Sequence, residues 1–184
     1  MKADRDKWNA KYKQARENPQ PCAAVERFWP LASGKGRALD LAAGLGVNSI
    51  FLADQGFEVD AVDISDVALA YLKDRHPRVS PISADLDHYT IAAQTYDLIL
   101  NIHFLKRRLF PLIMEGLKPG GVLIVETFLE GDPEGADETT CRDYLLRPNE
   151  LLHAFLKLRV LYYEEKPNVP PIRASHLATL VARR

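Results

Sequence analysis

The sequence has 184 residues, of which 24 are basic and 25 are acidic, and its formal net charge is −1 at pH 7. This length fits a single domain with one sizeable core. The balanced charge gives no basic field to hold a nucleic-acid backbone, and no stretch approaches the ~20 apolar residues of a membrane span. Cys22 and Cys141 match neither a disulfide framework nor a metal site. We therefore expect one cytoplasmic domain over residues 1–184, with no metal and with neither a membrane nor a nucleic acid as partner.

The first 33 residues predict a helical cap. Trp8, Tyr12 and Ala15 follow one another at spacings of four and three among charged residues, which places one apolar stripe on a helix over residues 4–17. The prolines at 19 and 21 end this helix, and a second helix is expected over residues 21–32.

Between residues 37 and 127, short apolar runs alternate with amphipathic stretches, as parallel strands and their crossover helices do. Ser65 is the expected N-cap of one helix and Gly56 the expected end of another. The glycines after Pro119 predict a turn. The expected strands are 38–42, 57–62, 78–84, 96–102 and 122–127, and the expected helices are 47–55, the stretch from Ser65 to near His76, and 109–117.

The rest of the chain adds a closing unit over residues 148–184. Residues 129–143 are polar and acidic and suggest a mobile loop, after which a helix is expected over 149–156. The last two strands, 158–164 and 177–181, are joined by a short proline-containing link and should be antiparallel neighbours. The pattern as a whole predicts an α/β, doubly wound, Rossmann-like sheet of seven strands, mostly parallel with an antiparallel last strand and with helices on both faces.

One motif carries functional information. Asp40-Leu-Ala-Ala-Gly44-Leu-Gly46 follows the first core strand, and Asp63 ends the next strand, nineteen residues after Gly44. In open parallel sheets, ligands bind beyond the carboxyl ends of the strands, and glycines there allow a close approach to the backbone. An acid at the tip of the second strand can accept hydrogen bonds from both ribose hydroxyls. The motif therefore predicts a nucleoside.

Two residues favour a nucleoside without a pyrophosphate. The third glycine of a dinucleotide-binding motif is replaced by Ser49. Asp40, in the first strand, would repel a diphosphate but can hold an ammonium group. S-adenosylmethionine has an ammonium group and no phosphate.

Over residues 37–127 the sequence resembles the class I S-adenosylmethionine-dependent methyltransferases, and in particular their small tellurite-resistance and thiopurine-type branch. The resemblance is carried by five stretches in order, namely Ala38 to Gly46, Val62-Asp63-Ile64-Ser65, Ala84-Asp85-Leu86, Tyr96 to Asn101, and Leu117-Lys-Pro-Gly-Gly121. It implies S-adenosylmethionine as cofactor, S-adenosylhomocysteine as product, a small-molecule acceptor, and a monomer or homodimer.

The resemblance also implies where the cofactor is bound. Asp40, Gly44 and Gly46 would meet its methionine portion, and Asp63 would hold the ribose hydroxyls. Ala42 and Asn101 are further residues expected to bind the cofactor.

Four more residues would complete the cofactor site. Ile64 would lie against the adenine ring, and Asp85 with Leu86 would bind the adenine amino group. Tyr12, together with Trp8, would either close over the site or only pack against it.

The catalytic residues implied are Asn101, where the methyl group meets its acceptor, and His103 just beyond it. In-line transfer from a sulfonium needs alignment in a dry site more than acid–base chemistry. If the acceptor is a thiol or an oxygen, His103 is the candidate base, and otherwise it only packs at the strand end. Two other functions stay open, a nicotinamide-dependent oxidoreductase and a ligand-binding domain without activity.

Overall fold

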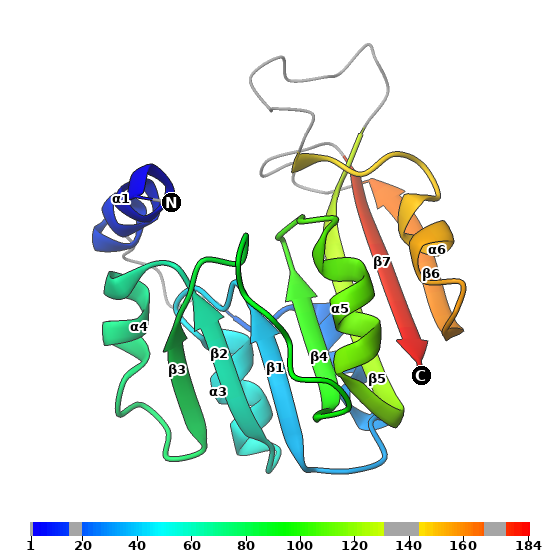
Figure 1. The fold of residues 1–184 in the computed structure, drawn as a ribbon, viewed down its shortest axis with the longest axis horizontal. Coiled ribbons are helices and arrows are strands. Elements are labelled where there is room, and N and C mark those ends of the chain that lie inside the picture. The colour runs from blue at the N-terminus through cyan, green and yellow to red at the C-terminus, as the bar shows by residue number, and fades with distance from the viewer. Residues whose placement is uncertain (1, 15–19, 131–143, 168–175) are drawn as a thin grey trace.

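The computed structural model describes residues 2–14, 20–130, 144–167 and 176–184. Within these ranges the chain forms one sheet of seven strands with helices on both faces (Figure 1). The strands are β1 (Arg37–Leu41), β2 (Glu58–Asp63), β3 (Val79–Ser83), β4 (Tyr96–Ile102), β5 (Leu117–Leu129), β6 (Arg159–Pro167) and β7 (His176–Arg183). The helices are α1 (Lys2–Lys13), α2 (Ala23–Phe28), α3 (Val47–Asp54), α4 (Asp66–Leu72), α5 (Leu109–Gly116) and α6 (Glu150–Ala154), with a 3-10 turn, η1 (Trp29–Leu31).

The strand order is β3-β2-β1-β4-β5-β7-β6. The first five strands are parallel, and β7 is antiparallel to both β5 and β6. This confirms the predicted doubly wound, mostly parallel sheet. Because β1 has β2 on one side and β4 on the other, the chain changes direction across the sheet between β1 and β4. That switch point is where open α/β sheets bind ligands, at the carboxyl ends of the strands.

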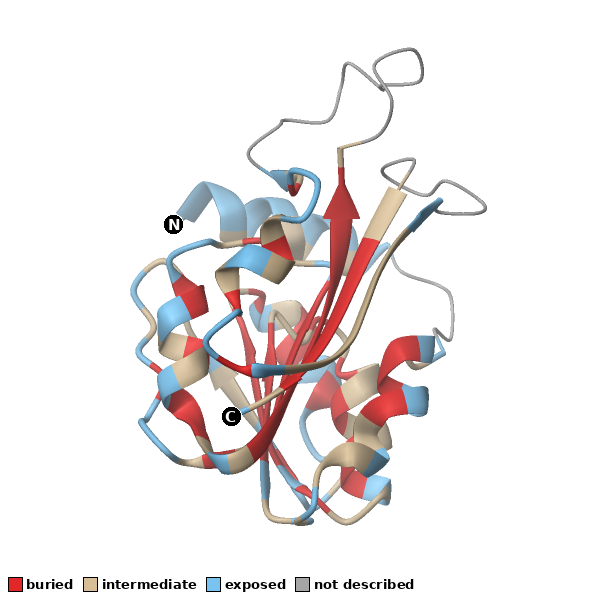
Figure 2. Ribbon diagram, turned by 90° about the vertical axis from the view of Figure 1, so that its right-hand side faces the viewer, coloured by how far each residue is buried: buried red, intermediate tan, exposed pale blue. Residues whose placement is uncertain are grey.

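The sheet is buried on both faces. One core packs α5 and α6 against side chains such as Leu39 and Ile99, and the other packs α2, α3 and α4 against side chains such as Ala38 and Leu98. Figure 2 shows the central strands as the most continuously buried part of the molecule. Strands buried on both faces read as near-continuous apolar runs, which is why the sequence revealed them.

Most predicted boundaries are confirmed to within a few residues. The Ser65 hydroxyl caps α4 by accepting a hydrogen bond from the Ala68 backbone N–H at 3.2 Å, as expected of an N-cap. Gly56 follows α3 with φ of +103°, the left-handed conformation of a helix end. Helix α5 begins at Leu109, so Pro111 lies in its first turn.

Strand β5 differs from its prediction. It begins at Leu117 and not at residue 122, because Leu117 pairs with Tyr96 before the register shifts and Val122 pairs with Leu98. The residues predicted as a turn are instead extra residues of an irregular strand start. A strand can include turn-forming residues as an irregularity when its pairing with the neighbouring strand resumes beyond them.

Three parts of the predictions lie outside the described residues. The end of the first predicted helix, with Ala15 and Pro19, falls in residues 15–19. Most of the predicted loop over 129–143 falls in residues 131–143, although Leu129 itself ends β5. The link between the last two strands falls in residues 168–175.

The centre of β4 should be sensitive to truncation. Leu100 is fully buried between β1 and β5, so Leu100→Ala should lower the free energy of unfolding by about 3 kcal/mol, from lost burial and the cavity left behind. Urea denaturation measures this, and Leu156→Ala is the matched control, since that side chain is 62% exposed. Equal effects of the two substitutions would contradict the assigned core.

Candidate functional site

The loop after β1 is a tight turn built on left-handed residues. Ala42, Gly44 and Gly46 have φ values of +58°, +55° and +73°. The Ala43 backbone N–H donates to the Val62 carbonyl at 3.0 Å, which fixes the turn to β2. A Cβ on Gly46 would lie 2.3 Å from a methyl carbon of Leu72. A side chain at position 46 would be strained by the left-handed backbone and would displace the Leu72 side chain of α4.

Asp63 joins this turn to the end of β2. One carboxylate oxygen accepts a hydrogen bond from the Gly44 N–H and the other from the Ser65 N–H, both at 2.8 Å. Burial raises the pKa of Asp63, while the hydrogen bonds from Ser65, Gly44 and Ile64 oppose that rise. The structure thus brings the two halves of the predicted motif into direct contact.

Asp40 is buried on the α3 side of the sheet. The Ser49 hydroxyl, in the first turn of α3, donates to its carboxylate at 2.6 Å. Burial raises the pKa of Asp40 to about 7, a rise that the Ser49 hydrogen bond opposes and the nearby Asp63 charge assists. Ser49, which replaces a dinucleotide-binding glycine, is thus a partner of this carboxylate.

Helix α1 lies beside α4 near the carboxyl ends of β2 and β3 (Figure 1). The Asn9 side-chain oxygen accepts hydrogen bonds from the Ser65 hydroxyl at 2.7 Å and from the Val67 N–H at 3.3 Å. Trp8 stacks on Tyr12 with 5.9 Å between the ring centroids. The Tyr12 hydroxyl lies only 2.6 Å from the position that a Cβ on Gly44 would occupy. Helix α1 therefore places the Tyr12 side chain against the glycine turn.

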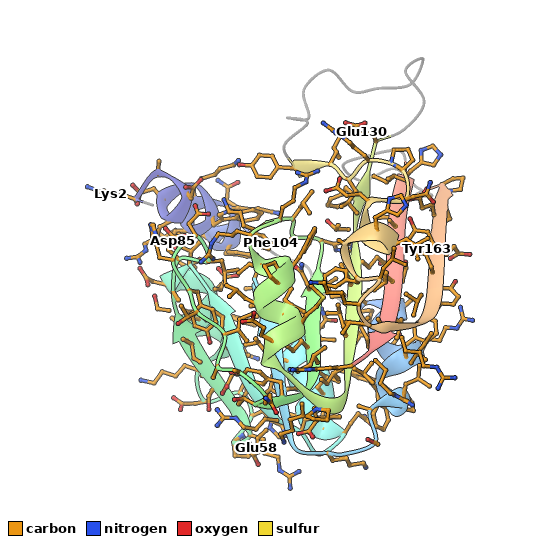
Figure 3. All side chains as sticks on the ribbon, turned by 45° about the vertical axis from the view of Figure 1, so that its right-hand side comes forward. Lys2, Glu58, Asp85, Phe104, Glu130 and Tyr163 are labelled. Atoms are coloured by element: carbon orange, nitrogen blue, oxygen red, sulfur yellow. The ribbon has the colours of Figure 1, made fainter. Side chains whose placement is uncertain are left out.

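Asp85 and Leu86 follow β3. Asp85 is half-buried and its carboxylate accepts a hydrogen bond from the Asp87 N–H at 2.9 Å, which lowers its pKa. Leu86 is buried in the core on the α5 side. Asp85 and Phe104 lie at one end of the sheet, opposite Glu58 (Figure 3). Ile64, between Asp63 and the cap of α4, is partly exposed.

Asn101 is a buried polar residue near the end of β4. It pairs with Leu41 of β1 and Val125 of β5, and its exposure is 0%. Within the described part of the chain, neither its amide nitrogen nor its amide oxygen has a hydrogen-bond partner. Such groups are rare in native proteins and cost free energy, so they call for a ligand or another explanation.

His103 follows β4 in a left-handed conformation, with φ of +55°. Its backbone N–H donates to the backbone carbonyl of Glu126 at 2.7 Å, and its ring stacks on Phe128 with 5.2 Å between centroids. Its Nε2 lies 3.6 Å from the Glu126 carboxylate, and 45% of the side chain is exposed. The imidazole is thus held beside a carboxylate while keeping access to solvent.

Glu126 is the site residue that sequence reasoning missed. It is buried in β5, where it accepts hydrogen bonds from the Thr179 hydroxyl at 2.8 Å and from the Cys22 thiol at 3.3 Å. Burial would raise its pKa, but His103, Thr179 and Cys22 outweigh burial and lower the pKa to about 2. The available signal was a single charged residue inside the apolar run Val122 to Phe128.

No helix among the described residues is long and apolar enough to cross a membrane. In the same part of the chain, no group of three or more His, Cys, Asp or Glu side chains is placed to hold a metal ion.

Comparison with known families decides the class of this site. Residues 38–121, which contain the glycine turn, Asp63, Asp85 and Asn101, match a family model described as a methyltransferase domain. This part of the chain is therefore similar to methyltransferase domains.

Curated relatives named as methyltransferases also match part of the chain. A demethylmenaquinone methyltransferase of Beutenbergia cavernae is 34% identical over 98 residues, which cover 50% of this chain and 40% of the relative. The chain spans between 40% and 48% of the length of the curated relatives it matches.

Two solved structures share the fold. TehB from Haemophilus influenzae matches with a TM-score of 0.74 and 22% identity, over 98% of this chain and 66% of TehB. Phosphoethanolamine N-methyltransferase 2 of Haemonchus contortus, solved with S-adenosylmethionine, matches with a TM-score of 0.69 and 19% identity, over 88% of this chain and 51% of that protein. The predicted resemblance to class I S-adenosylmethionine-dependent methyltransferases is confirmed.

Asp40 should make the stability of this methyltransferase domain depend on pH. Because its folded pKa of about 7 is above the ordinary value of 3.8, the folded state retains the proton between these values. The unfolding free energy should therefore fall as the pH rises from 4 to 7, by up to about 1.4 kcal/mol per unit of pKa shift. It should level off above pH 7.

The comparison that isolates this effect is with Asp40→Asn, which cannot titrate and can still accept the Ser49 hydrogen bond. Stability should be measured by urea denaturation across the pH range, with the exposed Asp74→Asn as control. If the wild-type protein and Asp40→Asn keep a constant difference from pH 4 to 7, the raised pKa is wrong.

Proposed function

We propose that this chain binds S-adenosylmethionine at the carboxyl ends of β1 and β2 and transfers its methyl group, in line, to a small-molecule acceptor. The observation that carries the proposal is the pair of hydrogen bonds from Gly44 and Ser65 to Asp63. A carboxylate oxygen can accept more than one hydrogen bond, so Asp63 retains the capacity to accept from a ribose hydroxyl as well. In the proposal, Ile64 packs on the adenine ring, and Asp85 with Leu86 recognises its amino group.

The glycine turn and Asn101 fit the methionine portion. Ala42, Gly44 and Gly46 would offer backbone groups of the left-handed turn, and Asn101 would offer the amide that lacks a partner within the described residues. Tyr12 would cover this portion from α1. In the proposal, Asp40 contributes negative charge beneath the turn in its ionised form, while the hydrogen bond that it accepts from Ser49 holds α3 in place.

S-adenosylmethionine supplies an electrophilic methyl group on a sulfonium, which is a good leaving group. The work left to the protein is to align the acceptor and to exclude water. Asn101 lies near the carboxyl end of β4 and His103 lies just beyond that end, and we assign both to the acceptor side. His103 would take a proton where the acceptor carries one.

A small acceptor is supported by two observations. The net charge of −1 gives no field for a polyanion, and the relatives named as demethylmenaquinone methyltransferases act, by that name, on a small molecule. We further propose that residues 1–184 form one domain, with the cap 1–33 over the core 37–127, which works in the cytosol as a monomer or homodimer.

The nicotinamide-dependent alternative is disfavoured by Ser49, whose hydroxyl is bonded to a buried acid where a dinucleotide motif has glycine. Thermal melting with each cofactor separates the alternatives, because only a ligand that binds the folded state raises the melting temperature. S-adenosylmethionine at 100 times its dissociation constant should stabilise by about 2.7 kcal/mol. Stabilisation by a nicotinamide dinucleotide alone would contradict the proposal.

A test of turnover distinguishes an enzyme from a binding domain. Donor consumption should be measured over a panel of small thiols, phenols, amines and carboxylates, with S-adenosylhomocysteine formation as the readout. Tight donor binding without turnover on any acceptor would favour a ligand-binding domain.

Asp63→Ala should weaken the binding of S-adenosylmethionine by roughly 10- to 100-fold, because hydrogen bonding to a charged group would be lost. Isothermal titration calorimetry measures the affinity. Asp74→Asn, an exposed acid outside the site, should bind like the wild-type protein. An unchanged affinity in a folded Asp63→Ala protein would refute the assignment.

A further inference from the structure

Glu126 lies in the sheet on the side that faces α2, and three different segments supply its partners. The Thr179 hydroxyl on β7 donates to one carboxylate oxygen at 2.8 Å, and the Cys22 thiol, just before α2, donates to the other at 3.3 Å. That second oxygen is also the one that lies 3.6 Å from Nε2 of His103. A buried carboxylate fixed on two sides thus presents one oxygen to a histidine.

The same strand holds the imidazole in place. The backbone N–H of His103 donates to the backbone carbonyl of Glu126 at 2.7 Å, and the imidazole ring stacks on Phe128, two residues further along β5. These contacts hold His103 in a left-handed conformation, which costs a non-glycine residue free energy and often marks a functional site. Since Nε2 faces Glu126, Nδ1 is the nitrogen left to meet an acceptor.

A negative charge lies beside the His103 imidazole, in the form of the Glu126 carboxylate. Hydrogen bonds keep the pKa of Glu126 at about 2 despite its burial, so it is an anion at every physiological pH. Burial and the Glu126 charge raise the pKa of the Cys22 thiol to about 12, so Cys22 stays neutral. Lys166 on β6 also interacts electrostatically with Glu126. The nearest fixed charge to His103 is therefore negative.

We propose that Glu126 positions His103 as a general base and that the methyl acceptor is a hydroxyl or thiol that loses its proton during transfer. The inference rests on the proposed function. In the step, the acceptor oxygen or sulfur forms a bond to the methyl carbon while the sulfonium–methyl bond breaks and its electron pair returns to sulfur. The acceptor proton goes to Nδ1 of His103, and the resulting imidazolium is stabilised by the Glu126 carboxylate, as in other acid–histidine pairs.

The first test needs no substrate. Glu126→Gln removes the charge and keeps the shape, so the pKa of His103, followed by NMR and assigned with His103→Gln, should fall by about one unit. Glu115→Gln, an exposed acid on α5, should leave it unchanged. Glu126→Asp keeps the charge but moves it one methylene further away, so this variant should lower the pKa of His103 by less. It keeps the test available if Glu126→Gln does not fold. An unchanged His103 titration in the folded variants would overturn the inference, whether or not methyl transfer is observed.

The second test uses activity. With a small aromatic thiol or a catechol as acceptor, Glu126→Gln should lower kcat/KM at least tenfold and shift the acidic limb of its pH profile in step with the NMR titration. Its affinity for S-adenosylmethionine should stay within twofold of the wild-type value. Transfer only to acceptors without a removable proton, or an unshifted profile, would overturn the inference. A wild-type protein that does not bind the donor, yet shows the expected titration shift, would defeat the proposed function alone.

Discussion

The structure depends on one buried carboxylate, that of Asp63, which links three segments of the chain. Its two oxygens accept backbone hydrogen bonds from Gly44 in the turn after β1 and from Ser65 at the cap of α4. Ser65 in turn donates to Asn9, so the position of α1 is coupled to the same carboxylate. Burying a charge is costly unless it is hydrogen-bonded, and the two backbone donors offset that cost. The shape of the glycine turn and the docking of α1 therefore follow from one residue at the tip of β2.

A second polar centre lies along the same edge, where β4, β5 and β7 meet. It exists because β7 inserts antiparallel beside β5 and brings Thr179 opposite Glu126, although 53 residues separate them in sequence. The two centres differ in their exposure to solvent. Asp63 is almost completely buried, whereas the imidazole beside Glu126 is half-exposed. In the proposed enzyme this division places cofactor recognition in the protected part of the edge and the acceptor in the accessible part.

The sequence predicted the elements whose signals are local. Ser65 and Gly56 mark helix ends because capping chemistry needs only neighbouring residues, and Gly44 and Asp63 were paired because parallel strands end at a common edge. The start of β5 was mispredicted, since the residues from Lys118 to Gly121 have turn-forming propensity that the strand overrides by shifting register. Glu126 was missed because a lone acid in an apolar run gives no sign of which partners it will meet.

The sequence alone determined the order of strands and helices along the chain and the acid at the edge of the sheet, because hydrophobic period and turn chemistry are properties of short stretches of chain. Only the tertiary structure decided that Asn9 meets Ser65, that Ser49 meets Asp40, and that Glu126 meets His103, Cys22 and Thr179. These contacts depend on strand register and on how helices dock across the sheet. A one-residue change in register would point each side chain to the opposite face, and no local pattern in the chain specifies that choice.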